Sequence, residues 1–182
     1  MTEIQDRYAA IAAGFAERLA AAPADTWSSP SPCSEWTAGD VAAHVVRTHR
    51  NVLSMLDGSD APAVGADDDV MAEWEQATGA MTAALADPAI ATRTINSRFG
   101  DMTFQDMVGR MVCADTLIHT WDLARATGGN EELDPDSVTH VVGFLSAAGD
   151  RLRGPGGFGP ALEPPAGADD VATLMSFAGR TV

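Results

Sequence analysis

Residues 103–126, TFQDMVGRMVCADTLIHTWDLARA, form the longest helical pattern of the sequence. Apolar side chains recur in this stretch at helical spacing, namely Phe104, Met107, Val108, Met111, Leu117, Ile118 and Trp121. Gly128 and Gly129 follow it, and glycine commonly ends a helix. We therefore predict one long apolar helix from about Thr103 to Ala126.

Three more helices are predicted before this segment, because each range carries one apolar face. Their ranges are 3–21, roughly 38–56 and 70–85. The second has a defined start, since Thr37 and Asp40 form a capping-box pattern directly before its apolar run. Residues 91–102 combine β-branched residues with a central turn, which favours a short extended or hairpin connection.

A fifth helix is predicted from Asp134-Pro135, since proline is tolerated in the first turn of a helix. The loop GPGGFGP at 154–160 ends this pattern, and a short helical tail covers about 168–178. These segments predict an all-α protein, an antiparallel four-helix bundle with additional short C-terminal helices.

The 182-residue length fits a single domain over residues 1–182. We expect the bundle to occupy about 3–152 and a C-terminal extension to occupy 153–182.

The charge balance excludes several classes of partner. Eleven basic residues against 26 acidic ones give a net charge of −15, which repels nucleic acid and anionic membrane surfaces. No apolar run approaches the roughly 20 residues of a membrane span. Glu3 and Asp6 stand where a signal peptide would carry basic residues, so we expect a cytoplasmic protein. Cys33 and Cys113 lack metal-site or disulfide spacing and are expected to be small buried residues.

Asp115 and His119 are the most informative polar pair. Residues four apart on a helix lie about 6 Å apart along the axis and roughly 40° apart around it, so both side chains can face one ion. A carboxylate and an imidazole suit Zn²⁺ or Ni²⁺. A plain surface ion pair explains the same spacing. Asp122 returns to the same helical face and could orient an imidazole or act as a further ligand.

A third ligand must come from another helix, and His44 in the apolar second helix is the best candidate. His49 lies about 140° further around that helix and is flanked by arginines, so we expect it to face solvent. His140 is not expected to be a ligand. Trp36 and Trp121 are expected to pack in the core.

Arg125 follows Trp121 by one turn, and two readings of it stay open. It either pairs with Asp122 or binds an anionic substrate.

Two motifs carry a resemblance to a known family. The first is Pro32-Cys33-x-x-Trp36-Thr37-x-x-Asp40-x-x-x-His44, and the second is Asp115-x-x-x-His119-x-x-Asp122-Leu123. Together with Arg98-Phe99-Gly100 and Gly157-Phe158-Gly159-Pro160, they resemble the DinB-like superfamily. More closely, they resemble the mycothiol-dependent maleylpyruvate isomerase N-terminal domain.

The resemblance implies that His44, Asp115 and His119 bind a divalent metal, usually zinc. It also implies that mycothiol, a small thiol, binds the metal as a thiolate and attacks an electrophilic small molecule. Asp115 replaces the glutamate of the isomerase and is one methylene shorter. Members of the superfamily often pair, so a homodimer is a possible assembly.

Three functional hypotheses follow. The first is a metal-dependent thiol transferase or isomerase acting on a small electrophile. The second is a non-catalytic metal-binding sensor or ligand carrier that uses the same three residues. The third is a structural helical protein whose polar residues form an ion-pair network.

Overall fold

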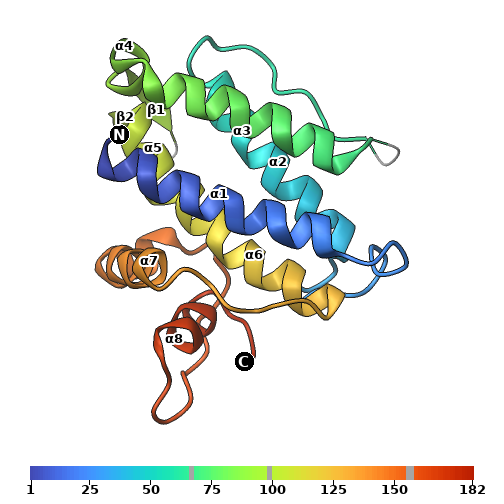
Figure 1. Ribbon diagram of the computed structural model, residues 1–182. Helices are drawn as coiled ribbons and strands as arrows, with labels where there is room; N and C mark the ends of the chain where they lie inside the picture. The colour runs from blue at the N-terminus through green and yellow to red at the C-terminus, as the bar shows by residue number, and fades with distance from the viewer. Residues whose placement is uncertain (66–67, 98–99, 155–157) are drawn as a thin grey trace.

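The computed structural model describes residues 1–65, 68–97, 100–154 and 158–182, and most of them are helical (Figure 1). The long helices are α1 (Glu3–Ala21), α2 (Ala38–Ser54), α3 (Val70–Ala86), α6 (Cys113–Thr127) and α7 (Pro135–Ala148). Shorter elements are α4 (Pro88–Ala91), α5 (Phe104–Met107), the π-helical turn η1 (Val108–Val112), the 3-10 turn η2 (Gly149–Leu152) and α8 (Asp170–Phe177).

Helix α2 starts where the sequence predicts. The hydroxyl of Thr37 accepts a hydrogen bond from the backbone N–H of Asp40 at 3.2 Å, and the Asp40 carboxylate accepts one from the Thr37 N–H at 2.9 Å. This reciprocal pair satisfies two N–H groups that a helix start otherwise leaves free. Thr2 and Gln5 cap α1 in the same way.

The long helix predicted over 103–126 is present as a sequence of three elements, α5, η1 and α6. The chain stays helical throughout, but five residues at Val108–Val112 adopt the wider π-helical turn. Gly128 ends α6 in the left-handed conformation, at φ 68°. Glycine adopts this conformation without the steric cost that a side chain would bring.

The predicted connection at 91–102 contains an antiparallel strand pair. Strands β1 (Thr94–Ser97) and β2 (Gly100–Thr103) pair in register, with Thr94 opposite Thr103 and Ser97 opposite Gly100. The hairpin is a departure from the all-α class, while the chain as a whole remains mostly helical. Arg98 and Phe99, which belong to the family motif, lie outside the described residues, as does Gly157.

Four helices pack together in a ring. Helix α1 packs against α6 and α3, and α2 packs against the same two helices, so the contacts close into a ring. Figure 1 shows α1 lying across α6, with α2 and α3 on one side and α7 and α8 on the other. Two groups of buried side chains fill the interior, one centred on α6 and the C-terminal helices and one between α1, α2 and α3.

Pro88 begins a helix as well as following one. The preceding Asp87 caps α4 by accepting a hydrogen bond from the Ala89 N–H, and proline fits the first helical position. Among the described residues, no helix is long and apolar enough to cross a membrane.

Candidate metal centre

A pocket of about 720 Å³ opens between α2, the η1–α6 helix and two C-terminal segments. Helix α2 contributes His44, and α6 contributes Asp115 and His119. The C-terminal segments contribute residues 158–160 and 178–180 to the opposite wall. The pocket is therefore built from parts of the chain that are far apart in sequence.

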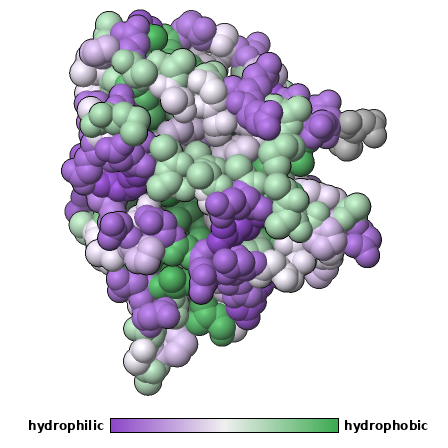
Figure 2. All heavy atoms as spheres, in the orientation of Figure 1, coloured by the Kyte–Doolittle hydropathy of each residue, from purple (hydrophilic) through white to green (hydrophobic). Residues whose placement is uncertain are grey.

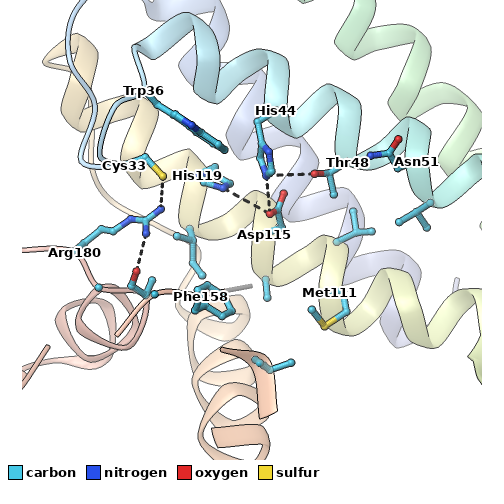
Figure 3. Close-up of a pocket in the computed structure, with 18 of the residues that line it drawn as sticks. Cys33, Trp36, His44, Thr48, Asn51, Met111, Asp115, His119, Phe158 and Arg180 are labelled. Carbon is cyan, nitrogen blue, oxygen red and sulfur yellow. Dashed lines mark hydrogen bonds and ion pairs between the residues drawn. The ribbon is translucent and has the colours of Figure 1, made fainter. Parts of the chain in front are cut away.

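The three predicted ligands converge in this pocket (Figure 3). His44 Nε2 lies 3.1 Å from Asp115 Oδ1, and His119 Nε2 lies 3.6 Å from the same oxygen. One ligand atom from each residue lies within 4.8 Å of the other two. Two helices thus bring two imidazoles and one carboxylate to a common point.

Asp115 carries an unmatched polar atom. Its second oxygen, Oδ2, is buried and has no hydrogen-bond partner among the described residues. Burial alone would raise the pKa of this carboxyl group, but the nearby His119 and the hydrogen bond and charge of His44 lower it below its ordinary value. The carboxylate is therefore charged at neutral pH and lacks full compensation from protein groups.

Asp122 holds the His119 ring from the opposite side. Its Oδ2 lies 2.9 Å from His119 Nδ1, and its side chain is completely buried. When Nδ1 donates its proton to this carboxylate, the lone pair of Nε2 faces the pocket, as metal binding requires. Burial raises the pKa of Asp122, but hydrogen bonds from His119 and Arg180 lower it below its ordinary value.

Arg180 completes this arrangement and was not recognised from the sequence. Its guanidinium donates to both oxygens of Asp122, at 2.7 and 3.1 Å. Arg180 lies 58 residues from Asp122, so no local spacing connects the two. The C-terminal segment therefore supports the imidazole of His119 through Asp122.

Trp36 lines the pocket and also packs against the buried group between α1, α2 and α3. It is partly exposed, and its ring stacks on that of His119 with centroids 5.8 Å apart and an angle of 27°. Its ring also contacts His44, with centroids 4.7 Å apart. The expectation of core packing is confirmed for the buried Trp121 and only in part for Trp36, which packs against the core while it lines the pocket.

Cys33 also departs from expectation, because it is only half-buried and lines the pocket. Its Sγ lies 3.0 Å from the Arg180 guanidinium. Burial raises the pKa of the thiol and outweighs the lowering effect of Arg180, so Cys33 is a neutral thiol at neutral pH. Cys113 is fully buried, as expected.

Two other predictions do not match the structure. His49, expected to face solvent, is completely buried, and its Nδ1 donates to the Val45 carbonyl oxygen at 2.9 Å. Arg125 is not brought to the pocket: it pairs with Glu131 at 2.9 Å and lies over the ring of Trp121. Arg125 does not pair with Asp122, whose partners among the described residues are His119 and Arg180, and its binding of an anionic substrate stays a prediction.

The residues at this site fit a divalent metal ion. Two imidazoles and a carboxylate are a ligand set typical of open zinc sites, and the orphaned Asp115 Oδ2 offers the charge that such an ion would neutralise. A second group, Cys33, His119 and Asp122, is also close enough for an ion. It fits less well, because Arg180 and His119 already occupy the oxygens of Asp122.

The fold and the site together define a helical protein with a two-histidine, one-carboxylate cluster at the wall of a pocket. Residues 8–124 match the model of the mycothiol maleylpyruvate isomerase N-terminal domain. The chain belongs to this family, with which the DinB-like superfamily is consistent. Residues 158–160 are part of a motif that resembles the family, but they lie beyond the matched range.

Two similar proteins come from Mycobacterium tuberculosis: the uncharacterized protein MT0763 of strain CDC 1551 / Oshkosh and the uncharacterized protein Rv0738 of strain ATCC 25618 / H37Rv. Each is 32% identical over 170 residues, covering 92% of this chain and 92% of the relative. No solved structure matches the chain significantly.

Proposed function

We propose that this protein is a divalent-metal-dependent thiol transferase or isomerase that uses mycothiol against a small electrophile. His44, Asp115 and His119 are the metal ligands in this proposal. Zinc is the favoured ion, because it accepts imidazole and carboxylate ligands equally, and nickel is the alternative.

The observation that supports the proposal most strongly is the convergence of the three ligand atoms within 4.8 Å at the pocket wall. An ion-pair network alone explains this less well, because Asp115 Oδ2 is buried and unpaired among the described residues. A bound cation would remove that cost.

Each protein group has a defined task in the proposed site. His44 and His119 present Nε2 to the ion, and Asp122 keeps the His119 proton on Nδ1. Trp36 covers the two imidazole rings and limits the access of water to them. When bound, the metal ion would supply positive charge that keeps a thiol in its nucleophilic thiolate form.

The thiol is supplied by a co-substrate in this proposal. The raised pKa of Cys33 makes this residue a poor nucleophile at neutral pH, although it lines the pocket. The name of the matching family includes mycothiol, which supports this small thiol as the co-substrate.

The family also guides our interpretation of the architecture. We infer that the closed ring of contacts between α1, α2, α3 and α6 is the antiparallel four-helix bundle of DinB-like proteins. Such bundles place metal ligands on facing helices, and α2 and α6, which pack against each other, carry the three proposed ligands.

The decisive experiment is elemental analysis of the purified protein beside a His119→Ala variant. We expect a stoichiometric divalent metal in the wild-type protein and its loss in the variant, with the helical circular dichroism signal unchanged. A protein without stoichiometric metal after incubation with zinc would contradict the proposal.

Turnover is tested separately by incubating the zinc-loaded protein with mycothiol and a panel of electrophiles. Thiol consumption above that of the metal-free protein supports catalysis. A metal-loaded protein that consumes no thiol would instead point to the sensor or carrier function.

A further inference from the structure

The pocket extends to both sides of the metal cluster. Figure 3 shows Cys33, Trp36 and Arg180 on one side of the His44–Asp115–His119 cluster, and Met111 and Asn51 on the other. The two sides differ in charge: the first contains the guanidinium of Arg180, whereas Asn51 and Met111 on the second are uncharged. The cluster therefore lies between an end with a cation and an uncharged end that contains the apolar side chain of Met111.

The apolar part of the wall is rich in flexible side chains. Three of the eight methionines of the chain line the pocket. The apolar lining residues include Met55, Met107, Met111, Val112, Leu152 and Phe158. Methionine is unbranched and adapts to the shape of what it contacts, so such a wall accepts apolar groups of varied outline.

The charges of the pocket do not favour a substrate with two negative charges. Among the described lining residues, Arg180 is the only arginine, and the sequence contains no lysine. Its guanidinium already pairs with the buried carboxylate of Asp122. Maleylpyruvate, which the family name includes, is a dicarboxylate, and none of the described lining residues offers a second cationic side chain for its other carboxylate. Arg47 is not a lining residue and lies 3.3 Å from Nδ1 of His44.

We propose that the electrophilic substrate of this protein is an apolar molecule, with an alkyl or aryl group that binds against the methionine-rich wall. This inference rests on the proposed function for the reacting end of the substrate only. The apolar wall is a property of the chain itself and can be measured without the metal.

The test uses two series of probes. The first is acetohydroxamate, butanohydroxamate, hexanohydroxamate and octanohydroxamate, which share a metal-binding head and differ in alkyl length, titrated into the zinc-loaded protein by calorimetry. We expect affinity to rise about fourfold per methylene until the wall is filled, because each buried methylene contributes a constant transfer free energy. Maleate, a small dianion, is expected to bind no more tightly than acetohydroxamate.

The second series is butanol, hexanol and octanol, added to the metal-free protein and followed by tryptophan fluorescence. The same rise per methylene is expected here, since alkanols need no metal. This arm separates the two proposals: a protein that fails to bind zinc but still discriminates alkanols by length contradicts the proposed function and supports the apolar wall.

Variants identify the wall. Met111→Gln and Met55→Gln replace an apolar side chain by a polar one of similar length, and Met55 is exposed enough, at 40%, that folding does not depend on it. We expect both variants to reduce the increase in affinity per methylene, whereas Met111→Leu should retain this increase. A wild-type protein whose affinity is independent of chain length in both series overturns the inference, as does tighter binding of maleate than of octanohydroxamate.

Discussion

The contacts of His119 show how one imidazole of the proposed metal site is held in place. Asp122 fixes its Nδ1 side at 2.9 Å, and Arg180 fixes Asp122 in turn. Trp36 stacks on the face of the ring. The ring therefore has its orientation and its proton position set before any ion binds.

Replacing Asp122 by Asn should weaken metal binding without removing a ligand. The amide cannot accept the Nδ1 proton as strongly, so the orientation and basicity of His119 both suffer. We expect the dissociation constant for zinc to rise about 10- to 100-fold, measured by competition with a chelator. Asp60→Asn removes the same charge from an exposed position and is expected to leave the constant unchanged.

His49 should make the stability of the protein depend on pH. Burial lowers the pKa of His49 from 6.5 to about 4, so the folded state keeps it neutral where the unfolded chain takes up a proton. Stability is therefore retained above the unfolded pKa and falls as pH decreases from 6.5 to about 4. The full loss is about 3 kcal/mol.

Urea unfolding of the metal-free protein at several pH values measures this loss. His49→Leu removes the titrating group and keeps an apolar side chain of similar size, so its stability should vary less between pH 6.5 and about 4. Asp115 and Asp122, whose carboxyl pKa values are lowered, change the free energy of unfolding only at still lower pH. Their contribution is therefore separate from that of His49. Identical pH profiles for the wild-type protein and His49→Leu would contradict this assignment.

The histidines also show what a sequence pattern reveals at this scale. His49 follows Val45 by four residues and precedes Val52 by three, so it continues the buried stripe of α2. Two other features instead favoured a solvent-facing side chain: His49 lies about 140° around the helix from His44, and arginines lie beside it. Arg180 offered no signal, because its partner Asp122 is close only after the chain has folded.

At the scale of elements, the start of α2 is a testable part of the site. Thr37→Ala removes one half of a capping box and should lower the free energy of unfolding by about 1 kcal/mol. Thr2→Ala removes the equivalent hydroxyl from α1 and should cost a similar amount. Denaturant unfolding measures both changes.

The two variants should differ in zinc affinity. Helix α2 carries His44 seven residues after Thr37, whereas α1 carries no predicted ligand. We expect Thr37→Ala to weaken zinc binding modestly and Thr2→Ala to leave it unchanged. Equal zinc affinities in the two variants would mean that loosening the first turn of α2 does not alter the position of His44.

Most helices and the hairpin could be predicted, because their signals are local: apolar spacing, capping residues, glycine stops and β-branched runs. The π-helical turn Val108–Val112 could not, since nothing in the sequence VGRMV marks a change from α to π hydrogen bonding. This turn directly precedes α6 and includes Met111 and Val112 of the pocket wall. The π geometry changes how α6 presents its side chains, so the exact shape of the pocket was not predictable.

At the scale of the whole molecule, the net negative charge bears on the proposed metal site. Hydrophilic residues are spread over the face seen in Figure 2, with apolar residues between them. The net charge of the chain is −15. This field raises the local concentration of cations near the protein and opposes the approach of anions. The negative field agrees with a proposed metal site, which would bind a cation. It also agrees with an electrophilic substrate that carries little negative charge.

Zinc should stabilise the entire fold, because its proposed ligands connect α2 to α6, which pack against each other in the helical ring. A ligand at 100 times its dissociation constant adds about 2.7 kcal/mol to the free energy of unfolding when it binds only the folded state. For a chain of this length that corresponds to a rise of roughly 5–10 °C in Tm. Scanning calorimetry with and without zinc measures the shift.

The acidic surface requires a control, since 26 carboxylates also attract divalent ions without a defined site. Magnesium binds such surface carboxylates but has little affinity for imidazole, so it should leave Tm nearly unchanged. His119→Ala should lose most of the zinc shift, because one imidazole of the cluster is gone while the surface is the same. An equal shift in the variant, or with magnesium, would place the stabilising ions on the surface and not between α2 and α6.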